Sequence, residues 1–221
     1  MSGGGPNGHL GGAEVDGSPG NRRRRAVLAG HGGNVAGARE LSTDPDPAVR
    51  AAALGALGRL GALDDAIVLG ALDDPDADVR RRACAVAGRR GDPGSSAAVL
   101  GRLVRALDDS EPSVVETAAW ALGEFGARCG PDAVGGLCRV AGTHGSPLCR
   151  EAAVAALGAV GAPDTLDAVL AALDDTANIR RRAAIALAAF DDPRADEGLR
   201  RCLADRDWQV RQAAEELLAE S

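Results

Sequence analysis

The chain has 221 residues, of which 45% are hydrophobic and only 2% aromatic, with no tyrosine. This length allows one or two ordinary domains or one repeat array, and the core has to be built from alanine, leucine and valine. The formal net charge of −7 argues against nonspecific attraction of the whole surface to nucleic acid or to acidic membranes.

The N-terminal region differs in composition from the rest of the chain. Residues 1–21 are polar and rich in glycine, so we predict a disordered tail, followed by a solenoid domain over residues 22–221. Arg22 to Arg25 form a basic run at the start of a short helix. The run is typical of a solvated helix face on an N-terminal cap, and contact with an anionic partner is the alternative.

Cysteine usage and hydropathy place the protein in the cytoplasm. The five cysteines are odd in number and widely spaced, which favours reduced thiols over a disulfide framework. No apolar run approaches 18 residues, so we expect no transmembrane helix and no membrane partner.

The stretch from Asp46 to Gly58, DPAVRAAALGALG, predicts one amphipathic helix with its start signal attached. Asp46 is a good N-cap, because its carboxylate can accept a bond from a free amide of the first turn. Pro47 occupies the first helical position, where a missing N–H costs nothing. Val49 begins the apolar face of the helix, and we call it the marker position of this copy.

The same pattern returns five more times, 30 to 35 residues apart, as in a solenoid array. The residue after the marker is arginine in five of six copies, and the residue four positions after it is always alanine. Alanine there allows a neighbouring helix to approach closely. The other markers are Val79, Val114, Cys149, Ile179 and Val210. We expect these helices near residues 46–60, 76–89, 111–126, 146–160, 176–190 and 207–220, each preceded by a shorter first helix.

The motif LDDPDADVRRRA (Leu72 to Ala83) and its copy LDDTANIRRRAAIAL (Leu173 to Leu187) resemble the short HEAT-like repeats of phycobilisome lyase subunits. The resemblance covers about residues 34–219. It implies an all-α, right-handed α-solenoid of about six helix-pair repeats. It also implies a ladder of charge-assisted bonds between the arginine after the marker and an aspartate five residues before the marker of a neighbouring repeat. That aspartate is found at Asp44, Asp74, Asp109, Asp174 and Asp205, with His144 in its place in the fourth copy.

The sequence contains no catalytic constellation that we recognise. HEAT-repeat deoxyhypusine hydroxylases bind iron through His-Glu steps, and no histidine here is followed by glutamate. Cys129, Cys138, His144 and Cys149 lack the tight paired spacing of a zinc site, so we predict buried thiols, with no metal and no cofactor. A non-enzymatic role is favoured, and a lyase-like or hydroxylase-like enzyme or accessory subunit is the alternative.

The candidate site is a surface instead. The residue two positions after each marker lies on the side of the helix opposite the apolar residues that form the core. It should therefore line the concave face of the array. The third copy departs most from the pattern, with Val115 in the arginine position and Glu116, Trp120 and Glu124 at i, i+4 and i+8. A tryptophan beside two carboxylates suits a cationic ligand. The predicted partner-binding residues are Arg81, Glu116, Trp120, Glu124, Glu151 and Arg181.

We therefore predict a protein-interaction scaffold or adaptor that binds a partner protein or peptide, with a basic segment, on its concave face. Two plainer interpretations stay open: the charged residues are only solvated or paired across repeats, and Trp120 fills the gap beside Ala85 and Ala155. Nucleic-acid binding is a further alternative. The arginine triplets at 80–82 and 180–182 favour it, whereas Glu116 and Glu151 interrupt any basic stripe.

Overall fold

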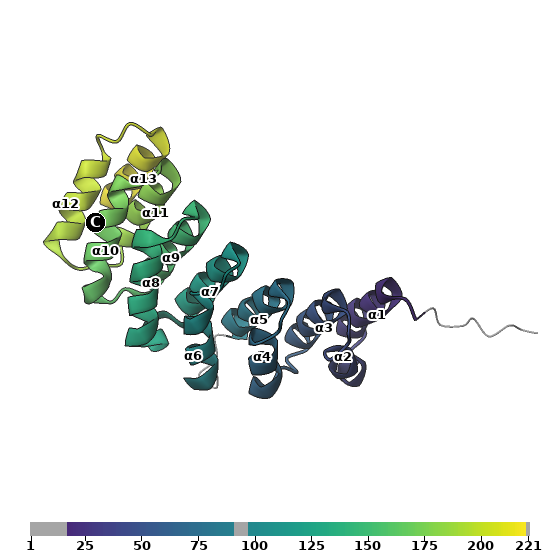
Figure 1. Cartoon of the computed structure of the whole chain (residues 1–221). Helices are drawn as coiled ribbons and strands as arrows, with labels where there is room; N and C mark the ends of the chain where they lie inside the picture. Colours follow the sequence, from purple (N-terminus) through teal and green to yellow (C-terminus); the bar gives the residue numbers. More distant parts are fainter. Residues whose placement is uncertain (1–16, 91–96, 220–221) are drawn as a thin grey trace, which may run out of the picture.

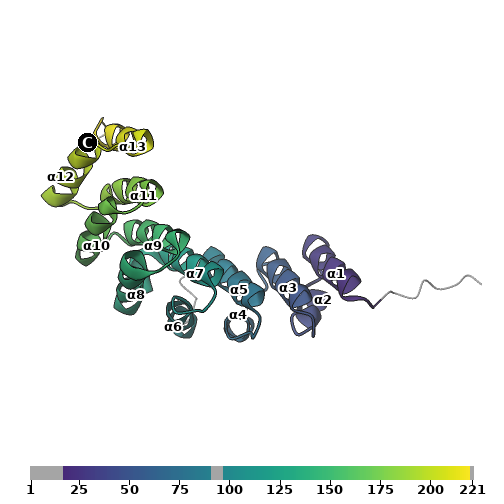
Figure 2. The same cartoon turned by 45° about the horizontal axis from the view of Figure 1, so that its top comes forward.

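The computed structural model describes residues 17–90 and 97–219, which form an elongated, curved stack of α-helices (Figure 1). Six helix pairs, α2–α3 to α12–α13, follow an additional first helix, α1. Figures 1 and 2 show α1 and the second helix of each pair along the inside of the curve, and the first helices along the outside. We call these the inner and outer helices. The predicted all-α solenoid of about six helix pairs is confirmed.

Each inner helix contacts the next one along the array. The inner helices are α1 (Pro19–His31), α3 (Pro47–Arg59), α5 (Ala77–Arg90), α7 (Pro112–Phe125), α9 (Pro147–Val160), α11 (Ala177–Leu187) and α13 (Trp208–Ala219). The outer helices are α2 (Val35–Leu41), α4 (Asp65–Leu72), α6 (Ala97–Ala106), α8 (Pro131–Thr143), α10 (Leu166–Ala171) and α12 (Pro193–Cys202). Short 3-10 segments follow α7 (η1, Gly126–Cys129) and flank α10 (η2, Pro163–Thr165; η3, Ala172–Asp174). None of the helices in the described ranges combines the length and the apolar character needed to span a bilayer.

Helix α1 corresponds to the short helix predicted from Arg22 onward, but it begins earlier, at Pro19, and it is a further inner helix of the array. Ser18 caps it by accepting a hydrogen bond from a first-turn N–H, and Pro19 occupies the first helical position. The helix packs along α3. Its Ser-Pro-x-x-Arg sequence at 18–22 parallels the Asp-Pro-x-x-Arg sequence at 46–50.

The boundary of the predicted N-terminal tail is therefore wrong by a few residues. The serine cap and the proline start the helix at Pro19, so the end of the predicted tail, up to residue 21, is helical. Residues 1–16 of that tail lie outside the described residues.

Small side chains bring the inner helices into close contact. The alanine four residues after the marker is completely buried in every copy (Ala53, Ala83, Ala118, Ala153, Ala183 and Ala214). A glycine nine residues after the marker faces the next inner helix. A Cβ atom built at Gly158 would lie only 2.7 Å from the Cβ of Ala186, and one at Gly123 only 3.2 Å from the Cβ of Ala156. These glycines therefore set how closely the repeats stack.

Among the described residues, five largely buried, bidentate arginine–aspartate ion pairs join successive repeats, and we call them the ladder. In each pair Nε and Nη2 of the arginine donate to the two carboxylate oxygens, the bidentate geometry that combines strength with directional specificity. None of the ten side chains is more than 23% exposed. The pairs are Arg22–Asp44, Arg50–Asp74, Arg80–Asp109, Arg150–Asp175 and Arg180–Asp205, with contacts of 2.7 or 2.8 Å.

Each ladder pair fixes two turns at once. Nη1 of Arg80 donates to the carbonyl oxygens of Asp74 and Pro75, at 2.9 and 3.0 Å, in the turn of its own repeat. On the other side, Oδ1 of Asp109 accepts a hydrogen bond of 2.9 Å from the N–H of Glu111 in the following turn. The pair therefore fixes the register of one repeat against the next.

One ladder residue differs from the expectation. Arg150 binds Asp175, whereas the resemblance had implied Asp174. The chain between Leu173 and the marker Ile179 is one residue shorter than the equivalent stretch of the second copy, and the 3-10 segment η3 tightens it. The next carboxylate thus takes the ladder position, and Asp174 instead contacts Arg201 at 3.4 Å.

The ladder is interrupted once, between α7 and α9, where both partners of one pair are replaced. Val115 stands in the arginine position and is completely buried, and His144 stands in the aspartate position. His144 keeps the aspartate's role within the turn, because its Nδ1 accepts a hydrogen bond of 3.1 Å from the N–H of Ser146. The thiol of Cys149 donates to the carbonyl oxygen of Pro112 at 3.2 Å, which gives this junction a weaker polar link.

Removal of one ladder arginine is expected to destabilise the array more than removal of an exposed inter-repeat arginine. Arg80→Ala leaves the largely buried Asp109 without its partner, which should cost about 2 kcal/mol. Arg139→Ala is the matched control: Arg139 also pairs across repeats, with Asp108 at 2.8 Å, but these side chains are 49% and 65% exposed. The control should cost less than about 1 kcal/mol. Urea unfolding followed by circular dichroism measures both, and equal losses would contradict a structural role for the ladder.

Stability should fall in acid because of the ladder carboxylates. Hydrogen bonds from arginine lower the pKa of Asp44, Asp109, Asp175 and Asp205. A lowered folded-state pKa stabilises the fold above the unfolded value of about 3.9, and this stability is lost as the pH falls through the folded pKa. The urea midpoint should therefore decline below about pH 4. The decline should be shallower in Asp109→Asn, and parallel curves for the two proteins would refute this origin.

The close approach at the glycine positions predicts opposite effects of two alanine substitutions. Gly158→Ala places a methyl group 2.7 Å from the Cβ and 2.9 Å from the Cα of Ala186, so it should destabilise by about 1–3 kcal/mol. A Cβ at Gly101 on α6 would have no described residue within 4 Å, so Gly101→Ala should stabilise by up to about 1 kcal/mol through helix propensity. Thermal unfolding distinguishes the two, and a harmless Gly158→Ala would show that α9 and α11 are not packed this closely.

Candidate functional site

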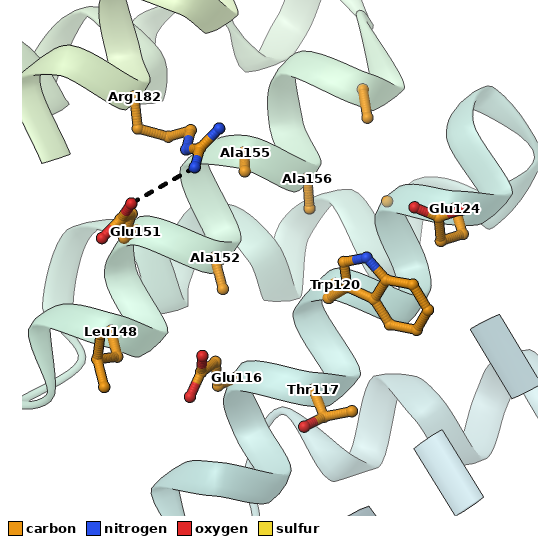
Figure 3. Close-up of a pocket in the computed structure, with 12 residues that line it drawn as sticks. Glu116, Thr117, Trp120, Glu124, Leu148, Glu151, Ala152, Ala155, Ala156 and Arg182 are labelled. Atoms are coloured by element: carbon orange, nitrogen blue, oxygen red, sulfur yellow. Dashed lines mark ion pairs between the residues drawn. The ribbon is translucent and has the colours of Figure 1, made fainter. Parts of the chain in front are cut away.

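A groove of about 530 Å³ opens on the inside of the curve, between α7 and α9, at the interrupted junction of the ladder (Figure 3). Helix α7 supplies Glu116, Thr117, Trp120 and Glu124 to one wall. The facing wall on α9 is mostly alanine, so the groove has one polar wall and one smooth apolar wall. Arg182 of α11 lies at its far end.

Trp120 is both packed and exposed. On one side its ring rests against Gly88 of α5, where a Cβ would lie only 2.7 Å from ring atom Cζ3. The indole nevertheless stays 38% exposed and lines the groove. Packing against the preceding repeat thus fixes the ring while leaving one surface available. The sequence had left packing between repeats and ligand binding as alternatives; the ring does pack against the preceding repeat, and ligand binding stays a prediction.

Carboxylates stand on both sides of the indole. Figure 3 shows Trp120 on α7 between Glu116 and Glu124, with Glu151 on the neighbouring helix α9. Glu151 contacts Arg182 at 3.6 Å. Glu116 and Glu124 form no ion pair with any described residue, so their charge is uncompensated in the free protein.

The α9 wall is suited to the aliphatic part of a ligand. Ala152, Ala155 and Ala156 provide a flat apolar surface opposite Trp120, and Leu148, which is 59% exposed, forms the rim. A long cationic side chain can lay its methylene groups on such a surface while its charged end meets the indole and the carboxylates. The groove thus combines an acidic, aromatic wall with an apolar one.

The structure gathers four of the six predicted partner-binding residues, Glu116, Trp120, Glu124 and Glu151, in this groove. The other two lie elsewhere on the inside of the curve. Arg81 lies between α3 and α5 and contacts Asp78 at 3.2 Å, and Arg181 faces α13. Partner binding by all six stays a prediction.

The sequence analysis missed Thr117, Leu148 and Arg182 as groove residues. Thr117 and Arg182 occupy the position three residues after the marker, and Leu148 the position just before it. Only the position two residues after the marker had been followed along the array. The same periodicity, applied to all positions of the inner face, would have found them.

Burial disfavours the thiolate form of the described cysteines. Burial raises the pKa of the Cys84 thiol to about 12, and it also raises the pKa of Cys129, Cys138, Cys149 and Cys202. A raised pKa keeps these thiols protonated at neutral pH, where they are poor nucleophiles and ligands. Within residues 17–90 and 97–219, no group of three or more His, Cys, Asp or Glu residues has the arrangement of a metal site.

Comparison with protein families gives matches over most of the array. The profile for HEAT repeats matches residues 65–143 and 136–219, and a second profile, also for a HEAT repeat, matches residues 38–63. None of the curated proteins matches the sequence.

Several solved structures share the fold. A chain of the complex of CpcE and CpcF of phycocyanin lyase from Nostoc sp. PCC7120 is 24% identical, with a TM-score of 0.59 over 83% of this chain and 75% of that chain. An engineered protein is 19% identical, with a TM-score of 0.64 over 84% and 97% of the two chains. A designed armadillo repeat protein in complex with the peptide (KR)4 is 16% identical, with a TM-score of 0.58 over 90% and 97%. At these identities the similarity concerns the fold alone.

Proposed function

Because the chain belongs to the HEAT-repeat family, we propose that it is a protein-interaction scaffold that captures a basic segment of a partner in the groove between α7 and α9. The observation that carries the proposal is the half-exposed Trp120 flanked by two unpaired carboxylates, Glu116 and Glu124. The indole offers the best cation–π surface among the side chains.

The electrostatics of the groove favour a cationic ligand over a neutral one. Glu116 and Glu124 gain a counterion only when the groove is occupied, whereas Glu151 is already near Arg182. Displacing Arg182 from that 3.6 Å contact costs little, because the pair is partly solvated. Basic residues along the partner segment can therefore pair with these carboxylates.

The shape of the groove favours an extended peptide. Its two walls come from the successive inner helices α7 and α9, and Arg182 of α11 extends its lining toward the next repeat. The designed armadillo protein offers an analogy, since a helical array of similar fold is in complex with a lysine–arginine peptide.

Binding of a fluorescein-labelled (Lys-Arg)4 peptide, measured by fluorescence anisotropy, tests the proposal. We expect Trp120→Ala to weaken binding about tenfold, since a desolvated cation–π contact and the lost apolar surface together amount to roughly 1–2 kcal/mol. Glu116→Gln with Glu124→Gln should weaken binding by a similar factor and reduce its dependence on salt.

The matched control is Glu40→Gln with Glu215→Gln, which removes the same charge from exposed positions outside the groove. This control should bind the peptide like the wild type. If it loses as much affinity as Glu116→Gln with Glu124→Gln, binding follows net charge and the groove is not the site. Unchanged binding by Trp120→Ala would remove the indole from the proposal.

A further inference from the structure

The inner face carries charges of opposite sign in different repeats. The positions two, three and ten residues after the marker face the groove between one inner helix and the next. On α3 and α5 these positions hold Arg59, Arg81, Arg82 and Arg89; on α7 and α9 they hold Glu116, Glu124 and Glu151. The groove between α3 and α5 is thus the basic counterpart of the groove at Trp120.

Gly55 leaves room on α3 for the side chains of Arg59 and Arg82. Gly55 occupies on α3 the position that Trp120 occupies on α7, six residues after the marker. A Cβ at Gly55 would lie 3.8 Å from Nη1 of Arg59 and 3.9 Å from Cζ of Arg82, so both guanidinium groups lie over this glycine. Two adjoining hollows, of about 340 and 610 Å³, share Gly55, Arg59 and Arg82 in their walls.

Within the part of the chain that the structure describes, these arginines have no counterion. Arg59, Arg82 and Arg89 form no ion pair with any described residue, in contrast to Arg81, which contacts Asp78, and Arg90, which contacts Asp65. Burial and repulsion from neighbouring guanidinium groups lower the pKa of Arg82, which is consistent with a concentrated positive charge.

The helix dipole accounts for only part of the cluster. Arg59 and Arg89 lie in the last turns of α3 and α5, where a cation is favourable. Arg82 lies in the middle of α5 and gains no such stabilisation, yet its guanidinium group lies over the same glycine, Gly55, as that of Arg59. The convergence of these side chains is unfavourable in the free protein and becomes favourable when an anion lies between them.

We propose that Arg59, Arg82 and Arg89 form an anion-binding site that holds an acidic peptide segment of a partner. Guanidinium groups bind carboxylates and phosphates in a bidentate manner, so aspartate, glutamate or phosphorylated side chains all fit this chemistry. A nucleic acid fits less well, because the basic surface ends at Glu116 and Glu124 of the next inner helix. This site does not depend on the function proposed for the Trp120 groove.

Fluorescence anisotropy with a fluorescein-labelled octaglutamate peptide tests the site. The wild type should bind this peptide and not an octaglutamine peptide of the same length. Arg59→Gln with Arg82→Gln should weaken binding at least about tenfold, since the variant loses charged hydrogen bonds to the carboxylates of the peptide. Relief of the repulsion between the two arginines should leave the unfolding midpoint of this variant unchanged or raised.

Arg105→Gln with Arg206→Gln is the matched control, because these exposed arginines also lack ion pairs among the described residues and lie outside the site. It should bind octaglutamate like the wild type. Equal affinity of the Arg59/Arg82 variant and the wild type would overturn the proposal. A labelled single-stranded octathymidine that binds more tightly than octaglutamate through the same arginines would also overturn it. Binding of (Lys-Arg)4 in the same variants reports separately on the Trp120 groove.

Discussion

The bidentate contact between an arginine of one inner helix and an aspartate in the turn of the next repeat organises the array. Because each arginine also binds the carbonyl groups of its own turn, one contact fixes two turns and their register. Glycines and alanines between the helices allow the close approach that these contacts require. The inner-face positions two, three and ten residues after each marker take no part in the ladder. They lie along the inside of the curve, and their side chains can differ between repeats.

The one interruption of the ladder coincides with the groove at Trp120. Val115 and His144 replace both partners of a single pair, so neither charge is left without its counterion. His144 keeps the hydrogen bond that the aspartate makes within the turn, because its Nδ1 accepts from the N–H of Ser146. Cys149 donates a hydrogen bond to the preceding inner helix. The indole adds packing against Gly88 on the other side of α7. Apolar contact thus substitutes for an ion pair in the repeats that carry the acidic groove.

The sequence predicted the fold well because helix caps, markers and alanines recur at regular spacing. It predicted a short helix from Arg22 but did not identify it as a copy of the inner helices. The reason is that Asn21, a polar residue, stands where the other copies have an apolar marker, although the Ser-Pro-x-x-Arg signal was present. It assigned the ladder to Asp174 in place of Asp175 because it assumed turns of equal length. The contact of Arg182 with Glu151 depends on where a long side chain reaches across a helix boundary, which periodicity alone does not give.

Comparison of the repeats with one another separates the residues that make the fold from those that make it specific. The cap, the ladder arginine and the buried alanine return in nearly every copy, because every junction needs them. The position six residues after the marker changes from Gly55 to Ala85 to Trp120, and the charge beside it changes from Arg59 and Arg89 to Glu124. Stacking does not require these changes. A basic stretch followed by an acidic one along a single curved face gives the array a polarity, and a ligand with segments of both charges would bind it in one direction only.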